Sequence, residues 1–262
     1  MRITAFLATA ALAVGVHLVA QAPAPRPDPL VRENTTQKVS DHVYVIPDNN
    51  VGMVPNVGII VGNTAVLVVD TGMGARNGAT VLKEAQKVAA GKPLFLATTH
   101  VHPEHDLGAH AFPATTKMIR ADAQVQEIAE DGYTTADRFK SMSPLNAELL
   151  KDAQFRKADI TFKDTYDVDL GGVKVRLMAM GFNHTKGDTA FFVEPDAVLF
   201  SGDIVMMRLP NVTGPESRVK QWMSSLDRFE SLKPKLIVPS HGPTGTTAMI
   251  EPYRAYFKKA PV

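Results

Sequence analysis

The chain has 262 residues, of which 45% are hydrophobic and 21% are charged, and its 28 basic residues nearly balance its 27 acidic ones. This length suits one globular domain, and a net charge of +1 argues against nucleic acid as a partner. The absence of cysteine excludes disulfides, thiolate-bound metals and a cysteine nucleophile, so any metal must be held by nitrogen and oxygen ligands.

The N-terminal segment has the pattern of an export signal. Arg2 precedes an almost entirely apolar run, and small residues and prolines follow it. This order predicts a secretory signal peptide at residues 1–22 and a periplasmic or secreted protein. A retained membrane helix is the alternative, but the run is only marginally long enough and His17 interrupts it. We expect a linker and N-terminal extension at residues 23–40, a folded domain at residues 41–262, and no stable membrane insertion once the signal is removed.

Short apolar runs of strand character alternate with helical segments along this domain. In the first half of the domain we expect a strand at 43–46, a hairpin of 57–61 and 65–69, a helix at 77–89, and strands at 94–97 and 118–119. A helical stretch over 121–158 should follow in two or three pieces, broken around Gly132 and Pro144. The second half should contain a hairpin of 168–170 and 173–178, strands at 190–193 and 198–200, a helix at 217–232, a strand at 236–238 and a helix at 250–259. Two mixed sheets packed together with helices outside would fit this order.

A cluster of histidines follows the strand expected at 94–97. The run His100-Val101-His102-Pro103-Glu104-His105 places three imidazoles and a carboxylate within six residues. In an extended loop His100 and His102 project to the same side, and a turn after Pro103 brings Glu104 and His105 to a second position. Imidazole together with carboxylate suits zinc, with iron and manganese as alternatives. The sequence therefore predicts a metal site in this loop.

Residues 99–108 resemble the signature loop of the metallo-β-lactamase superfamily, H-x-H-x-D-H followed three residues later by glycine. Other family elements follow the same order along the chain, namely an Asp70-Thr71-Gly72 turn and loops carrying His184, Asp203 and His241. The resemblance implies an α/β fold, a four-layer αβ/βα sandwich, with a dinuclear site at one edge. Within the superfamily, residues 56–58 and 202–210 look most like exported hydrolases of sulfur-oxidation and quinoprotein-associated clusters.

The resemblance also implies roles for these residues. The first metal would bind His100, His102 and His184, and the second would bind Glu104, His105 and His241. Asp203 would bridge the two metals. The expected cofactor is Zn²⁺, two ions per chain, and the expected partner is a small-molecule substrate.

Glu104 departs from the family pattern, which has aspartate at this position. The extra methylene moves the carboxylate by ~1.5 Å, whereas metal–ligand distances tolerate only about ±0.2 Å. Glu104 is therefore expected either to bind the second metal with altered geometry or to act as a general base.

Five further residues are expected near the metals. Asp70 would orient the histidine loop, and Asp106 would lie beside it or in solvent. Lys186 would attract an anionic substrate, and Met206 and Met207 would form an apolar wall of the substrate pocket.

The function expected from this set is an exported zinc hydrolase that uses a metal-bound hydroxide on an ester, thioester, lactone or amide bond. Asp203 would orient that hydroxide and accept its proton, so Asp203 and Glu104 are the catalytic candidates. One alternative is β-lactamase activity, against which Asp203 and Glu104 both count. The others are a mononuclear iron enzyme acting on sulfur compounds, and a metal-binding protein that has lost catalysis.

Overall fold

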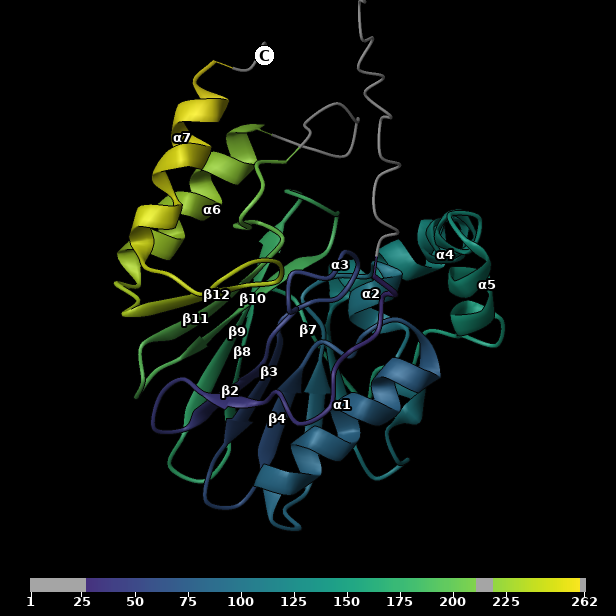
Figure 1. Cartoon of the computed structure of the whole chain (residues 1–262). Helices are drawn as coiled ribbons and strands as arrows, with labels where there is room; N and C mark the ends of the chain where they lie inside the picture. The colour runs from purple at the N-terminus through teal and green to yellow at the C-terminus, as the bar shows by residue number, and fades with distance from the viewer. Residues whose placement is uncertain (1–26, 211–218, 260–262) are drawn as a thin grey trace, which may run out of the picture.

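We describe a computed structural model of the chain over residues 27–210 and 219–259. The predicted signal peptide, residues 1–22, lies outside the described residues. Two β-sheets pack against each other in the middle of the molecule, and helices cover their outer faces (Figure 1). The first sheet has the strand order β1-β2-β3-β4-β5-β6-β7, and the second has the order β12-β11-β10-β9-β8. The predicted α/β sandwich of two mixed sheets is confirmed.

The strands are short and rich in β-branched residues, which suit a buried pleated surface. Those of the first sheet are β1 (Gln37–Lys38), β2 (Val43–Ile46), β3 (Val57–Val61), β4 (Val66–Val69), β5 (Leu94–Ala97), β6 (Lys117–Ala121) and β7 (Ile160–Phe162). Those of the second are β8 (Thr165–Asp169), β9 (Lys174–Gly181), β10 (Asp188–Val193), β11 (Val198–Gly202) and β12 (Leu236–Pro239). Strands β4 to β7 pair in parallel, as do β11 and β12.

The main core lies between the two sheets. Val45, Leu67 and Ala97 of the first sheet pack in one cluster with Phe191 and Phe200 of the second. Each of these side chains is at most 3% exposed. Alternate strand residues face away from this core and pack under the helices, which gives the four layers of the sandwich.

Helices complete the two outer layers. Helix α1 (Gly74–Ala89) packs on the first sheet, and α6 (Val219–Ser231) with α7 (Glu251–Phe257) packs on the second. The other helical segments are α2 (Pro103–Asp106), η1 (Ala109–Ala111), α3 (Asp122–Glu127), the π-helical turn η2 (Ile128–Gly132), α4 (Tyr133–Lys140), α5 (Pro144–Leu150) and η3 (Thr247–Met249). Val81, Ala85 and Ala89 of α1 are buried at helical spacing.

The helical stretch after β6 differs from the prediction in two places. The predicted break at Gly132 is wrong, because the chain runs from α3 through a π turn into α4 with Gly132 in helical conformation. A Cβ on Gly132 would lie 2.9 Å from the Phe155 ring, so this glycine provides close packing rather than an interruption. The break at Pro144 is confirmed, and Ser143 caps α5 by accepting a hydrogen bond from the Asn146 N–H. Residues 151–158 are not helical, and β1 and β7 were not predicted.

The described part of the N-terminal extension packs against the domain. The Val31 N–H donates to Asn77 of α1, and the hydroxyl of Thr36 donates to Glu84 two turns further along. Residues 37–38 then pair with β2 as an edge strand.

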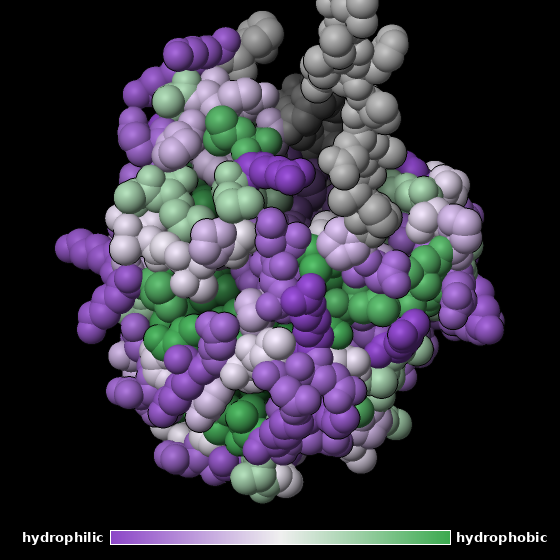
Figure 2. All heavy atoms as spheres, viewed as in Figure 1, coloured by the Kyte–Doolittle hydropathy of each residue, from purple (hydrophilic) through white to green (hydrophobic). Residues whose placement is uncertain are grey.

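The remaining surface is mixed. On the face shown in Figure 2, hydrophobic side chains gather in several separate areas with hydrophilic ones between them. Within residues 27–210 and 219–259, no helix combines the length and apolar composition that crossing a bilayer requires.

Candidate metal centre

The topology brings the singled-out histidines and aspartates to one edge of the sandwich. Asp70 follows β4 and His100 follows β5, and these strands are parallel neighbours. Asp203 follows β11 and His241 follows β12, which are parallel neighbours in the second sheet. Because parallel strands end at the same edge, their following loops meet there. His184 arrives from the loop between β9 and β10.

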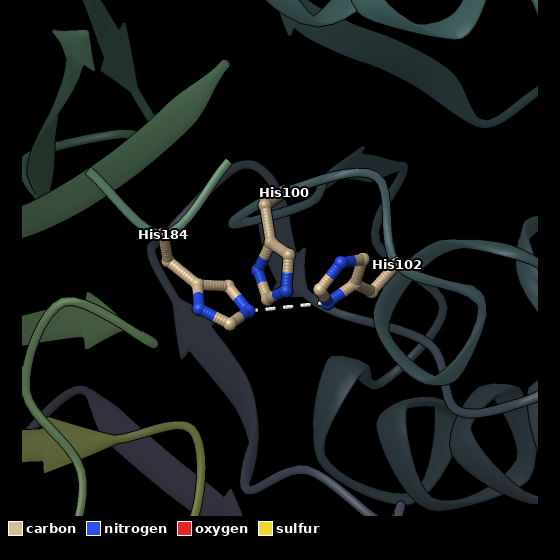
Figure 3. A group of neighbouring side chains, drawn as sticks. All are labelled: His100, His102 and His184. Atoms are coloured by element: carbon tan, nitrogen blue, oxygen red, sulfur yellow. Dashed lines mark hydrogen bonds between the residues drawn. The ribbon is translucent and has the colours of Figure 1, made fainter. Parts of the chain in front are cut away.

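The first group consists of His100, His102 and His184, whose ligand atoms all lie within 4.8 Å of one another. Figure 3 shows the three rings converging, with Nε2 of His184 3.2 Å from Nδ1 of His102. The His184 loop is held by the buried Asp188, whose carboxylate accepts hydrogen bonds from the backbone N–H groups of His184 and Thr185. Local backbone contacts therefore fix the imidazole that comes from the second sheet.

The second group consists of Glu104, His105 and His241, again with ligand atoms within 4.8 Å of one another. Pro103 is the first residue of α2, where its fixed φ favours a helical start. This short turn carries Glu104 and His105 round to the second position, as the sequence predicted. Nδ1 of His241 donates to the Val54 carbonyl at 3.0 Å, which leaves Nε2 directed toward the group.

Asp203 lies between the two groups. Its Oδ2 is 3.4 Å from Nε2 of His184 and 4.0 Å from Nε2 of His100. Its Oδ1 is 3.8 Å from Nε2 of both His105 and His241. One carboxylate oxygen thus faces each group. Gly202 precedes Asp203 with a φ of 59°, which is a left-handed conformation that glycine adopts without steric cost.

The electrostatics favour neutral imidazoles at His100 and His102 and an ionised carboxylate at Asp203. Burial, reinforced by the neighbouring imidazoles, holds the pKa of His100 well below its ordinary value, and the pKa of His102 is lowered in the same way. Burial alone would raise the pKa of Asp203, but the surrounding histidines, His241 first, lower it to about 2. Burial raises the pKa of Glu104. Metal ligands must be neutral imidazole or carboxylate, so His100, His102 and Asp203 already have the required protonation state at neutral pH.

Several buried polar atoms of this cluster have no hydrogen-bond partner. They are Nε2 of His100, Nε2 of His105, Oε2 of Glu104 and Oδ1 of Asp203. A buried polar atom without a partner costs free energy, and its persistence in a folded protein requires an explanation. Metal coordination supplies one, since the set is composed only of the nitrogen and oxygen donors that zinc accepts. The residues present therefore fit a metal ion in both groups.

Asp70 lies directly behind the histidines. Its Oδ1 accepts from the Thr99 N–H at 2.7 Å, and its Oδ2 accepts from the Thr99 hydroxyl and from Nδ1 of His105 at 2.9 Å. Burial lowers the pKa of His105, but Asp70, together with Asp203 and Glu104, raises it to about 9. Asp70 itself adopts a left-handed conformation with a φ of 68°.

Asp106 is fully buried and points away from the histidine groups. Its carboxylate pairs with Arg120 of β6 through both oxygens, with an Nη2–Oδ1 distance of 2.8 Å, and accepts a hydrogen bond from the Thr98 hydroxyl. The pair ties α2 to the first sheet beside the cluster. Arg120 was not among the residues predicted near the site, although a charged residue inside the otherwise apolar run of residues 118–121 is a signal of a buried ion pair.

The three residues predicted to line the substrate pocket do not lie together in the structure. Met206 and Met207 line a hollow of about 280 Å³ together with His241. Lys186 instead pairs with Glu130 and Asp131 on the π turn, which raises its pKa. The role of Lys186 toward an anionic substrate stays a prediction. Phe139 of α4 contacts His102 with ring centroids 5.7 Å apart, so α4 lies against the first histidine group.

The chain resembles proteins of known family. Residues 51–241 match the family described as the metallo-beta-lactamase superfamily. The human acyl-coenzyme A thioesterase MBLAC2 is 24% identical over 197 residues, which are 68% of this chain and 67% of that protein. The linear primary-alkylsulfatase of Pseudomonas sp. (strain ATCC 19151) is 23% identical over 210 residues, and the match covers 68% of this chain but only 39% of the alkylsulfatase.

Solved structures show the same fold at low identity. A metallo-beta-lactamase from Pontibacter korlensis superposes with a TM-score of 0.65 and 17% identity, covering 86% of this chain and 99% of that one. The DIM-1 metallo-beta-lactamase exposed to ceftazidime gives a TM-score of 0.64 and 17% identity, with coverage of 88% and 99%. At this identity the likeness concerns the fold of the chain.

Proposed function

The chain belongs to the metallo-β-lactamase superfamily, and from this premise we propose that it is a zinc-dependent hydrolase with two metal ions that cleaves an ester or thioester bond. Lactones and amides are the other candidate substrates. The observation that carries the proposal is the position of Asp203, with one carboxylate oxygen facing His100 and His184 and the other facing His105 and His241.

The proposal assigns a task to each residue. His100, His102 and His184 would hold one ion, Glu104, His105 and His241 the other, and Asp203 both, so the orphaned buried atoms gain partners. A zinc ion lowers the pKa of its bound water to about 7 and polarises the attacked carbonyl oxygen. Asp203, ionised and buried, orients the nucleophile by accepting its hydrogen bond. Asp70 keeps the His105 ring in the orientation that directs Nε2 inward.

The choice of ester and thioester rests on the surroundings of His241 and on the relatives. The hollow beside His241 has a wall of Met53, Met206 and Met207, which suits an apolar acyl group. One relative is named an acyl-coenzyme A thioesterase and another a linear primary-alkylsulfatase. Both names describe acyl or alkyl substrates, and the methionine wall is consistent with that class.

Two measurements test the proposal. Elemental analysis of the purified mature protein should find two zinc ions per chain, and a panel of esters, thioesters, lactones and β-lactams should identify a hydrolysed class. Asp203→Asn should reduce turnover strongly, whereas Asp167→Asn, at an exposed ion pair with Arg176, should not. One iron per chain would contradict the zinc assignment and favour redox chemistry. A protein without metal that regains none from added zinc would refute the proposal.

We propose further that the protein acts outside the cytoplasm. Support comes from residues 1–22, whose charged start, apolar run and small residues have the order of a secretory signal. Mass spectrometry of the protein recovered from the periplasm should give an N-terminus near residue 22.

A further inference from the structure

The hollow beside His241 does not end at the methionine wall. A second hollow of about 420 Å³ adjoins it, between the β1–β2 edge and the turn after β12. The two hollows share four lining residues, Asp48, Asn50, Met207 and Gly242. The second hollow has a mixed lining, in which Val39, Val45 and Pro243 provide apolar surface beside polar residues such as Gln37 and Thr244. The shared residues show that the two hollows adjoin, with Met207 at their boundary.

Met207 stands where the hollows meet, on a fixed backbone. Its N–H donates to the His241 carbonyl at 3.0 Å, and a Cβ on Gly242 would lie only 2.4 Å from the Met207 Cβ. The buried hydroxyl of Tyr253 accepts from the Met206 N–H and donates to the Arg208 carbonyl. The Met207 side chain itself is 54% exposed. Anchored backbone with a free thioether chain suits a residue that moves aside for a ligand.

The loop from Asp48 to Met53 forms the wall that faces Met207, and its backbone has an energetically unfavourable conformation. Asn49, Asn50 and Met53 have φ values of 52°, 57° and 60°. Asparagine tolerates this left-handed region, but it is strained for methionine. The Asp48 carboxylate fixes the loop by accepting from the backbone N–H groups of Asn50 and Gly242. Strained backbone that the surroundings enforce clusters at ligand-binding sites.

We propose that the two hollows form one channel for a long unbranched acyl chain, with Met207 as the residue that controls entry to its outer half. The proposal rests on the ester or thioester hydrolase proposed above and names its substrate class. The inner hollow alone, at about 280 Å³, falls below the range of roughly 300–1,000 Å³ typical of ligand sites, whereas the outer hollow extends it into that range. The acyl carbonyl lies at the His241 end, and the chain runs outward between Met207 and the strained loop.

The test is the dependence of kcat/KM on chain length for p-nitrophenyl esters from acetate to dodecanoate, with the zinc-loaded protein. Each added methylene that enters an apolar channel should raise kcat/KM by up to about fourfold. For the wild type this rise should continue beyond six carbons. Met207→Trp should block the junction and lower the ratio of kcat/KM for dodecanoate to that for butyrate at least tenfold. Leu209→Trp is the matched control, because Leu209 is 44% exposed and lines neither hollow, and it should keep the wild-type ratio.

The failures of the two proposals are distinguishable. Hydrolysis that stops gaining from chain length at about six carbons, or a Met207→Trp variant with the wild-type ratio, overturns the channel while leaving the hydrolase intact. Hydrolysis of no ester or thioester contradicts the proposed function instead. The channel is then judged by calorimetric binding of decanol against butanol. Tighter binding of decanol that Met207→Trp abolishes and Leu209→Trp keeps supports the channel, and equal binding of both alcohols refutes it.

Discussion

Oδ2 of Asp70 lies 2.9 Å from Nδ1 of His105, and this contact fixes which nitrogen of the imidazole faces the metal centre. Because Nδ1 donates to Asp70, the neutral form of His105 carries its lone pair on Nε2, which is the buried atom that has no other partner. The same carboxylate holds the Thr99 backbone, so one aspartate positions both the ring and the start of the loop.

Replacing Asp70 by asparagine should weaken binding at the second metal group selectively. Loss of a partner behind a metal-bound histidine typically costs about 10–100-fold in affinity. The first group, which does not include His105, should lose less affinity, because Asp70 reaches it only through the Thr99 hydroxyl, which lies 3.1 Å from Nδ1 of His100. Stepwise zinc titration against a chelator measures both affinities. Equal weakening of both ions, or of neither, would contradict this assignment.

The metal-free protein should lose stability as the pH rises from about 6.5 to about 9. Asp70 and the other carboxylates raise the pKa of His105 to about 9, above its ordinary value, so the folded state binds this proton more tightly than the unfolded state. The contribution is complete below pH 6.5 and disappears as the pH passes 9. Thermal unfolding in chelator across this range should show the decline, and Asp70→Asn should flatten it. An unchanged slope in that variant would exclude His105 as the source.

Shortening Glu104 to aspartate should lower occupancy of the second metal group. A carboxylate oxygen of Glu104 already lies within 4.8 Å of the ligand nitrogens of His105 and His241. The aspartate side chain is one methylene shorter, so it would withdraw the carboxylate by ~1.5 Å. Metal sites do not tolerate such a displacement without movement of α2. Metal counting by elemental analysis should fall toward one ion per chain, with Glu148→Asp on the exposed face of α5 as the matched control. A gain of metal and activity would instead identify Glu104 as a degraded ligand.

Breaking the Asp106–Arg120 pair should destabilise the fold severely. Both side chains are at most 1% exposed, and removing one partner from a buried pair typically costs about 3–5 kcal/mol because a charge is left uncompensated. Asp106→Asn should therefore lower the melting temperature by roughly 6–20 °C. Asp137→Asn removes an exposed partner of Lys140 and should cost at most about 1 kcal/mol. Similar decreases in melting temperature for both variants would show that the buried pair contributes no more to stability than the exposed pair.

The sequence predicted the histidine cluster better than its surroundings for a physical reason. Ligand residues must keep their type and spacing, so His100, His102 and His105 are recognisable in one loop, and buried strands such as Val57–Val61 are recognisable by composition. Strand β7 has only three residues and depends on pairing with β6 for its existence. Gly132 suggested a helix break, but its role is set by Phe155, a contact that local sequence does not encode.

The same limit applies to Asp106 and to the hollows. The sequence alone left Asp106 undecided between the cluster and solvent, because its partner Arg120 lies on β6, outside the histidine loop. The second hollow is formed by residues from three separate parts of the chain, so no single sequence motif predicts it. Candidate metal ligands can be predicted from their residue types and spacing in the sequence. Residues that act by packing or by ion pairing can be identified only once the fold shows which residues they contact.

The extension along α1 bears on where the domain can be cut. Glu84 is 1% exposed, and its carboxylate accepts hydrogen bonds from the Asn34 N–H and the Thr36 hydroxyl in addition to Lys87. Val31 covers apolar groups beside the same helix. A recombinant chain truncated to begin at residue 41 would therefore expose this carboxylate and part of the helix–sheet layer, together with an unpaired edge of β2. Cleavage of the proposed signal peptide near residue 22 would leave residues 31–38 in place, so the processed protein would keep the segment that covers its first helix.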